Sequence, residues 1–319
     1  MAGGDSIPVL GGLRMHTVAF VTDRTPSDAV ALAVRSNAGL QIRVLAPPSE
    51  QERIHSLGAE WANMTAQGKR AHAFGKLYRQ GAPGSRDYWR FCHTRWIVLA
   101  GDLLDNPPPH NAGIAVLDDD VLLFERLSQR LEETGRFHSE SQAESVMNGA
   151  FVLASPGVLT RFAAWLWALY NLPSASLSAI AWRFGTIKRR ADLNERQLAR
   201  MDPIFIREGQ YAHFTDMHAI DAFRFLSRSA QLPIQLRVIW SAGYRRSTCT
   251  AVHKLDKPED GDGATRLLIW REGAPRISSS GKPLCFVHLQ GPAAKRQYEY
   301  MKPFLIGLPN RSSHIKYRY

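Results

Sequence analysis

The chain has 319 residues, of which 45% are hydrophobic, including 8 Trp, 9 Tyr and 14 Phe; it can build a substantial core, which excludes a wholly disordered protein. Its 40 Lys and Arg side chains exceed its 29 Asp and Glu side chains, which gives a formal charge of +11. Such a charge favours polyanionic partners, including nucleotides, nucleic acid and acidic membrane surfaces, without choosing among them. Cys92, Cys249 and Cys285 form neither a metal-binding pair nor a disulfide framework, a pattern typical of a reducing compartment.

The first part of the chain predicts alternating strands and helices. Residues 1–13 are expected to form a flexible tail, after which residues 16–22 predict a strand, 28–37 a helix and 40–46 a second strand. A strand, a helix and a strand in such close succession are typical of a parallel α/β sheet.

Ligands of such sheets bind beyond the carboxyl ends of the strands. Thr22, Asp23 and Arg24 follow the first strand and are therefore candidate nucleotide-binding residues. The remaining elements predicted from periodicity and turn residues are helices at 51–57, 87–104, 125–133, 155–170, 187–201, 215–229 and 295–304, and strands at 236–240, 247–253, 265–270 and 284–290.

The most apolar region, residues 151–182, is interrupted by Pro156, Arg161 and Pro173, so it predicts a core helix and not a membrane-spanning one. The start of the chain lacks the basic residues and apolar run of a signal peptide. Together with the cysteine usage, these features predict a cytoplasmic protein, peripheral at most and only weakly associated with acidic membrane surfaces.

The central feature of the sequence is an apolar strand that leads into three aspartates, Asp118, Asp119 and Asp120, followed by further apolar residues at 121–123. Like-signed carboxylates so close together repel each other, and burying them unpaired is costly. A divalent cation bound through oxygen ligands removes this repulsion and retains positions for substrate phosphates. The alternative is a solvated acidic turn at a strand end.

This triplet resembles the DxD element of GT-A-fold glycosyltransferases. In that family the DxD aspartates bind a manganese ion held by the sugar-nucleotide diphosphate. The resemblance therefore implies that Asp118 and Asp120 are metal ligands and that Asp119 lies against the donor. Asn148 and Gly149 are similar to the family's Asn-x-Gly turn that approaches the donor sugar, with the glycine one residue early.

A second landmark lies near the end of the chain. His288, Gly291 and Lys295 are similar to the HxxGxxK element of glycogenin-like family-8 enzymes, with three residues instead of two between the glycine and the lysine. The resemblance implies that His288 completes the metal site. It also implies that Gly291 and Lys295 contact the phosphates, with Arg296 able to substitute for the lysine.

Elementary chemistry agrees with this assignment. Two carboxylates and a neutral imidazole form a suitable ligand set for Mn²⁺, or Mg²⁺ in its place. A metal ion together with Lys or Arg stabilises the negative charge that develops on a departing nucleoside diphosphate. Asp216 and Asp221 are further catalytic candidates, together with Asn148, as contacts for acceptor or donor sugar; a helix cap explains Asp216 equally well.

The sequence thus predicts a single α/β domain of GT-A type over residues 14–307, with a mostly parallel central sheet and a C-terminal, β-rich acceptor-side portion. Residues 14–123 are expected to bind the nucleotide, residues 124–307 to complete the acceptor and metal sites, and residues 308–319 to form a basic tail. The predicted activity is metal-dependent transfer of a sugar from a nucleotide-diphosphate donor, a UDP-sugar by family resemblance. Its acceptor is a glycan, a lipid-linked molecule or a protein, and nucleic acid is not an expected partner.

Two alternatives remain open. A phosphohydrolase of the haloacid-dehalogenase type also has a nucleophile strand that ends in Asp-x-Asp, but such motifs usually open the chain, and position 122 is Leu where Thr or Val is typical. A nucleic-acid-binding protein is suggested by the charge. Against it, the basic residues are dispersed and the aromatic residues lie in apolar runs.

Overall fold

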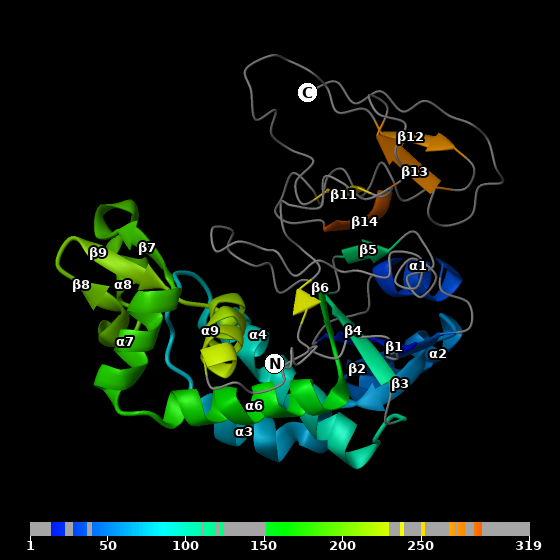
Figure 1. Cartoon of the computed structure of the whole chain (residues 1–319), viewed down its shortest axis with the longest axis horizontal. Coiled ribbons are helices and arrows are strands. Elements are labelled where there is room, and N and C mark those ends of the chain that lie inside the picture. The colour runs from blue at the N-terminus through cyan, green and yellow to red at the C-terminus, as the bar shows by residue number, and fades with distance from the viewer. Residues whose placement is uncertain are drawn as a thin grey trace, which may run out of the picture.

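A computed structural model of the chain describes residues 14–22, 28–36, 40–109, 112–118, 121–123, 151–229, 237–238, 250–252, 268–271, 274–277 and 284–288. The helices are α1 (Asp28–Ser36), α2 (Gln51–Ser56), α3 (Gly68–Leu77), α4 (Arg86–Asp105), α6 (Pro156–Asn171), α7 (Ser174–Phe184), α8 (Glu195–Leu198) and α9 (Asp216–Ser229) (Figure 1). The strands are β1 (Arg14–Val21), β2 (Gln41–Ala46), β3 (Glu60–Asn63), β4 (Ala112–Leu117), β5 (Val121–Leu123), β6 (Phe151–Ala154), β7 (Thr186–Arg189), β8 (Ile206–Arg207), β9 (Gln210–His213), β10 (Arg237–Val238), β11 (Thr250–Val252), β12 (Leu268–Arg271), β13 (Ala274–Ile277) and β14 (Leu284–His288).

The central sheet has six strands in the order β10-β6-β4-β1-β2-β3. β3, β2, β1 and β4 pair in parallel, whereas β6 is antiparallel to β4 and β10 is antiparallel to β6. The parallel part of an α/β sheet, predicted from the alternating strands and helices at the start of the chain, is therefore present.

The strand order reverses at β1, because β2 and β3 follow on one side of it and β4 lies on the other. Phe20 near the end of β1 is in register with Leu117 at the end of β4, so the two strands finish side by side. Ligands of open α/β sheets bind outside the carboxyl ends of the strands at such a reversal. Thr22 and Asp118, the residues that follow these two strands, therefore lie where a ligand is expected.

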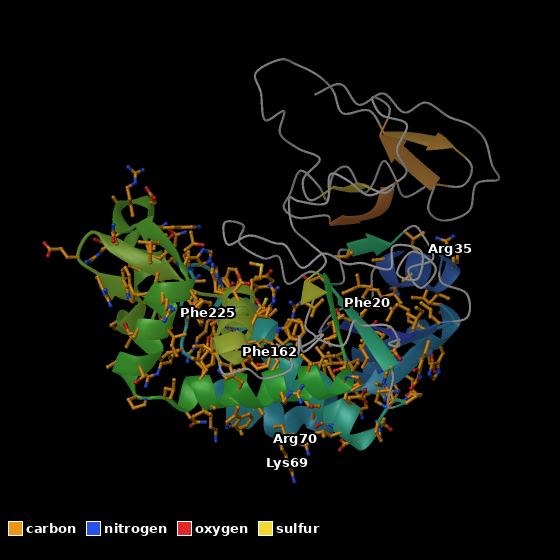
Figure 2. The ribbon with its side chains drawn as sticks, viewed as in Figure 1. Phe20, Arg35, Lys69, Arg70, Phe162 and Phe225 are labelled. Atoms are coloured by element: carbon orange, nitrogen blue, oxygen red, sulfur yellow. The ribbon has the colours of Figure 1, made fainter. Side chains whose placement is uncertain are left out.

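The two faces of the sheet are covered by different layers. On β1, Val18 and Phe20 pack with residues of α1, while Ala19 and Val21 belong to the cluster formed with α4 and α6. Phe20 lies beside the sheet inside the molecule and Arg35 lies on the outside of α1 (Figure 2). Successive side chains of β1 therefore pack against opposite layers, as expected for a strand that is buried on both faces.

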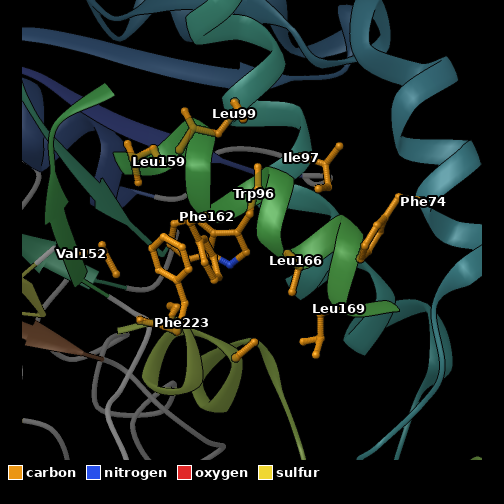
Figure 3. Close-up of a cluster of buried hydrophobic side chains, with 14 of the residues drawn as sticks. Phe74, Trp96, Ile97, Leu99, Val152, Leu159, Phe162, Leu166, Leu169 and Phe223 are labelled. Carbon is orange, nitrogen blue, oxygen red and sulfur yellow. The ribbon is translucent and has the colours of Figure 1, made fainter. Parts of the chain in front are cut away.

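The larger core lies where α4, α6 and α9 meet next to the sheet. Trp96 of α4, Phe162 of α6 and Phe223 of α9 point toward one another, close to Val152 of β6 (Figure 3). The ring centroids of Trp96 and Phe162 are 5.4 Å apart in an edge-to-face arrangement, and those of Phe162 and Phe223 are 5.3 Å apart. These contacts fix the start of α9 relative to α4.

Local signals explain where the long helices begin. The Ser85 side chain accepts a hydrogen bond from the backbone N–H of Tyr88 at the start of α4. The Ser155 side chain does the same for Val158 at the start of α6, and Pro156 occupies the first turn. The helix predicted over residues 155–170 is confirmed.

Some expectations were wrong. The residues predicted to form one helix over 187–201 instead form β7 and, after a short turn, the single-turn helix α8. Residues 186–189 form a strand because they pair with β9. Asn194 and Gln197 then form a capping box, which starts a new helix. The apolar residues before and after the aspartate triplet form β4 and β5, which lie in different sheets. Residues 274–277, for which no strand or helix was predicted, form β13.

Beyond residue 229 the described residues form short strands. β14 lies between β11, to which it is parallel, and β5, to which it is antiparallel, while β12 and β13 form an antiparallel pair. The predicted tails and the helices at 125–133 and 295–304 lie outside the described residues. Among the helices described, none combines the length and the hydropathy needed to cross a membrane.

Candidate active site

Asp118 is the first residue after β4, and its side chain is 24% exposed. Its backbone carbonyl accepts a hydrogen bond from the N–H of Val121 at 3.1 Å. Since Val121 begins β5 in a different sheet, the chain passes between two sheets at this point. The carboxylate of Asp118 therefore lies at the carboxyl end of a parallel strand and partly open to solvent.

The late histidine is brought to the same place. His288, the last residue of β14, is paired with Val121 in the antiparallel register between β14 and β5. Residues directly opposite in such a pair have Cα atoms about 4.5–5.5 Å apart. The strand that ends at His288 therefore pairs with the strand that follows Asp120 in the chain, although the two strands lie far apart in the sequence.

A buried arginine joins Asp118 to a second carboxylate. Arg95 of α4 donates from Nη1 to Oδ1 of Asp118, and from Nη2 to Oδ2 of Asp216 at 2.9 Å. The side chains of Arg95 and Asp216 are 10% and 4% exposed. Burial lowers the pKa of Arg95, but the carboxylates of Asp118 and Asp216 outweigh this effect and leave the pKa above its ordinary value. The ion pairs therefore connect α4, the end of β4 and the start of α9.

Asp216 also accepts a hydrogen bond from a tryptophan of α4. The indole Nε1–H of Trp96 donates to Oδ2 of Asp216 at 3.1 Å. This carboxylate therefore accepts hydrogen bonds from two neighbouring residues of α4, which fixes its orientation. Asp221, the other predicted catalytic carboxylate of α9, forms an ion pair with Arg224 at 3.8 Å on its own helix.

Sequence reasoning missed Arg95. The available signal was a charged residue inside an otherwise apolar stretch of the helix predicted over 87–104, since a buried charge needs a partner. The partners themselves could not be identified, because Asp118 and Asp216 are 23 and 121 positions away in the chain.

On α4, the side chains that share a face with Arg95 become more buried toward this arginine. Tyr88, Cys92 and Arg95 follow each other at helical spacing, and Tyr88 is 49% exposed whereas Cys92 is buried. Burial, with a smaller contribution from Asp216, raises the pKa of Cys92 to about 12. Its thiol therefore stays protonated at neutral pH, which argues against a nucleophilic role.

The histidines near the cluster are neutral. Nδ1 of His218 accepts from the backbone N–H of Thr215 at 3.1 Å, and its Nε2–H donates to Oγ1 of Thr186 at 3.0 Å. Burial lowers the pKa of His218 to about 4 and that of His213 to about 3. His218 therefore links α9 to β7 through its hydrogen bond with Thr186.

Thr22 follows β1, is buried, and donates its backbone N–H to the carbonyl of Leu45 at 3.0 Å. The other predicted site residues lie outside the described residues: Asp23, Arg24, Asp119, Asp120, Asn148, Gly149, Gly291, Lys295 and Arg296. Within the described part of the chain, no group of three or more His, Cys, Asp or Glu residues is arranged to hold a metal ion. Asp120 and the side chain of His288 lie outside the described part of the chain, so the predicted ligand set stays a prediction.

Comparison with known proteins adds little. No family model matches the chain, and no curated protein matches it. Among solved structures, the fold is similar to the apo crystal structure of mouse xyloside xylosyltransferase 1, with a TM-score of 0.40 and 11% sequence identity over 68% of this chain and 83% of that chain. Because this similarity is weak, the functional assignment depends on the site itself.

Proposed function

We propose that the protein is a glycosyltransferase that moves a sugar from a nucleotide-diphosphate donor to a hydroxyl acceptor. The observation that supports the proposal is the register between β5 and β14, in which His288 is paired with Val121, the residue that follows the aspartate triplet in the sequence. These are the two sequence elements that resemble the metal-binding motifs of such enzymes, and they come from distant parts of the chain.

The location of Asp118 supports a nucleotide donor. It follows β4 at the point where the strand order of the parallel sheet reverses, which is the usual position of nucleotide ligands in α/β sheets. In the proposed complex, Thr22, Asp23 and Arg24 border the nucleotide from the end of β1. Gly291 and Lys295, or Arg296 in place of the lysine, contact the diphosphate after β14.

The residues present suit a divalent cation. The carboxylate of Asp118 is partly exposed at the strand end, and Arg95 offsets its charge from the buried side. Asp118, Asp120 and His288 would hold Mn²⁺ or Mg²⁺ through oxygen and nitrogen atoms. When bound, the ion supplies Lewis-acid stabilisation of the negative charge on the leaving diphosphate.

The ion-paired cluster is suited to orient sugar hydroxyls. Asp216 accepts hydrogen bonds from Arg95 and Trp96, so its position is fixed before any ligand arrives. A carboxylate oriented in this way can accept a hydrogen bond from a donor or acceptor hydroxyl. In this proposal Arg95 acts as a positioning residue, because it holds both Asp118 and Asp216 in place. Asp221 and Asn148 stay proposed contacts of the sugars.

A donor panel tests the proposal. UDP-, GDP- and CDP-sugars are incubated with the full chain with and without Mn²⁺, and release of the nucleoside diphosphate is measured. We expect hydrolysis of the nucleotide sugars that carry one of the three bases, and we expect this hydrolysis to require Mn²⁺. Failure of every nucleotide sugar to react, together with phosphate release from phosphomonoesters, would contradict the proposal and support a haloacid-dehalogenase-type phosphohydrolase.

A further inference from the structure

Residues 183–213, here called the basic lobe, contain the sheet β7-β9-β8 and present a strongly basic surface. Its exposed basic side chains are Arg183, Lys188, Arg189, Arg190, Arg196, Arg200 and Arg207. Its carboxylates are fewer: Asp192, Glu195, Asp202 and Glu208. The sheet lies on the opposite side of α9 from the central sheet, at the left of Figure 1.

The strand register places basic and apolar side chains on one face of this sheet. Ile187 is opposite Ala212, and Arg189 and Arg207 are both opposite Gln210, so Ile187, Arg189 and Arg207 share a face. Ile187 is 41% exposed, and the side chain of Arg189 is 82% exposed.

The other face of the sheet contacts α9 at Thr186, while Lys188 on the same face is exposed. Thr186 lies on that face, and its hydroxyl bonds to His218 of α9. Ala212, opposite Ile187 in the centre of the sheet, is buried. On the edge strand β7, however, Ile187 and Arg189 present an apolar side chain and a cation together to the surroundings.

Aromatic side chains at the end of α7 and on α9 extend this surface. Cζ of Arg207 lies 4.1 Å from the ring centroid of Trp182, and Cζ of Arg183 lies 4.7 Å from that of Phe225. Phe225 is 45% exposed and also packs against Phe184, with centroids 5.5 Å apart. Arginines stacked on partly exposed aromatic rings combine a charged head with an apolar base, which is the composition favoured at a lipid–water interface.

We propose that the basic lobe docks on an anionic phospholipid bilayer. Its excess of cations is complementary to acidic headgroups, and Ile187 and Phe225 would gain from contact with the boundary of the acyl chains. Nucleic acid fits less well, because the aromatic rings that could stack on bases already carry an arginine on one face. Ile187, Arg189 and Phe225 are not among the residues proposed for the active site.

Sedimentation with lipid vesicles tests the proposal on the full chain. We expect binding to phosphatidylcholine vesicles that contain phosphatidylglycerol and not to vesicles of phosphatidylcholine alone. Binding should weaken as salt is raised, because the Debye length falls from about 10 Å at 0.1 M to about 3 Å at 1 M. Ile187→Gln should also reduce binding to the anionic vesicles while leaving its dependence on salt unchanged.

A matched pair of variants locates the surface. The double variant Arg189→Glu/Arg190→Glu should weaken binding to anionic vesicles by about tenfold or more, because each basic residue near an acidic bilayer contributes to the binding free energy. Lys69→Glu with Lys76→Glu makes the same charge change on α3, and Lys69 lies at the lower edge of Figure 2, away from the basic lobe. This control should change binding by less than about threefold.

The proposal would be overturned if both double variants lost vesicle binding equally, or if the Arg189/Arg190 variant bound anionic vesicles as well as the unmodified chain does. Equal binding to neutral and anionic vesicles would also overturn it. So would tighter binding to a DNA duplex than to anionic vesicles at equal phosphate concentration. The urea midpoints of both double variants should match that of the unmodified chain, because the exposed pair of Arg189 with Asp192 contributes little to stability. Donor hydrolysis without vesicles should also be unchanged. Failure of docking is therefore distinguishable from failure of the proposed activity.

Discussion

His288 stands opposite Val121 in an antiparallel strand pair, and this one backbone relationship brings the two ends of the proposed donor site together. β5 has only three residues, and its position is set by the turn that begins at Asp118 on one side and by β14 on the other. The last described strand of the chain is thereby placed at the carboxyl end of the parallel sheet.

Removing Arg95 should destabilise the fold. Arg95→Met leaves the carboxylates of Asp118 and Asp216 without their shared cation, and Asp216 is buried. Loss of one partner from a buried ion pair costs about 3–5 kcal/mol, and urea unfolding would measure it. Arg95→Lys should lose less, because the charge remains while the forked geometry is lost.

A matched control lies on the same helix. Arg90→Met removes the exposed pair of Arg90 with Asp87, which are 2.9 Å apart, and should cost less than about 1 kcal/mol. Equal small losses in the two variants would show that the Arg95 ion pairs do not stabilise the fold.

Stability should fall on mild acidification because of His218. Its pKa is lowered to about 4 in the folded protein, chiefly by burial, whereas it is about 6.5 in an unfolded chain. Between these two values the unfolded state binds the extra proton, so unfolding becomes easier as the pH drops from about 6.5 toward 4. The expected slope from this residue is about 1.4 kcal/mol per pH unit, present in that window and absent above it.

Urea midpoints across this pH range would measure the effect. His218→Gln should lower the slope by about 1.4 kcal/mol per pH unit, and the lowered pKa of His213 should maintain the remaining dependence. His72→Gln, at an exposed position of α3, should leave the slope unchanged. The same steepness in His218→Gln as in the unmodified chain would mean that His218 does not carry the effect.

Gly185 should not tolerate a side chain. It joins α7 to β7, and an added Cβ would lie 2.6 Å from the carbonyl oxygen of Ala181 and 3.0 Å from that of His213. Both atoms belong to the backbone, so Gly185→Ala should cost about 1–3 kcal/mol in urea unfolding.

Gly157 gives the opposite expectation. An added Cβ meets nothing within 4 Å at this position of α6, so Gly157→Ala should be neutral or stabilise by up to about 1 kcal/mol. If both alanines behaved alike, the close approach around Gly185 would not be a structural constraint.

The parts of the fold that follow from local sequence were predictable. β1 and β2 are short β-branched runs bounded by turn residues, and Ser155 with Pro156 gives a helix start that needs no tertiary context. The position of Asp118 after an apolar strand follows from the same logic. Strand β7 was not predictable, because residues 186–189 become a strand only by pairing with β9.

The candidate site was predictable only motif by motif. The aspartate triplet and the late histidine were singled out from composition, spacing and resemblance, but their meeting depends on the pairing of β5 with β14. The role of Arg95 depends on two partners that the chain brings from β4 and α9. Long-range pairings of this kind leave no periodic pattern in the sequence.

The most direct test of the proposed donor site is metal-dependent stabilisation by a nucleoside diphosphate. Thermal unfolding of the unmodified chain, Asp120→Asn and Asp87→Asn is compared with Mn²⁺ alone and with Mn²⁺ plus UDP, GDP or CDP. Asp87 is a suitable control because its side chain is 83% exposed at the start of α4. A ligand at 100 times its dissociation constant stabilises a protein by about 2.7 kcal/mol.

We predict that one of these diphosphates stabilises the unmodified chain and Asp87→Asn only when Mn²⁺ is present. Asp120→Asn should lose most of this stabilisation and about 10²-fold or more in turnover of the corresponding nucleotide sugar. Equal stabilisation of Asp120→Asn and the unmodified chain, or none in any of the three proteins, would contradict a metal-dependent donor site at the end of β4.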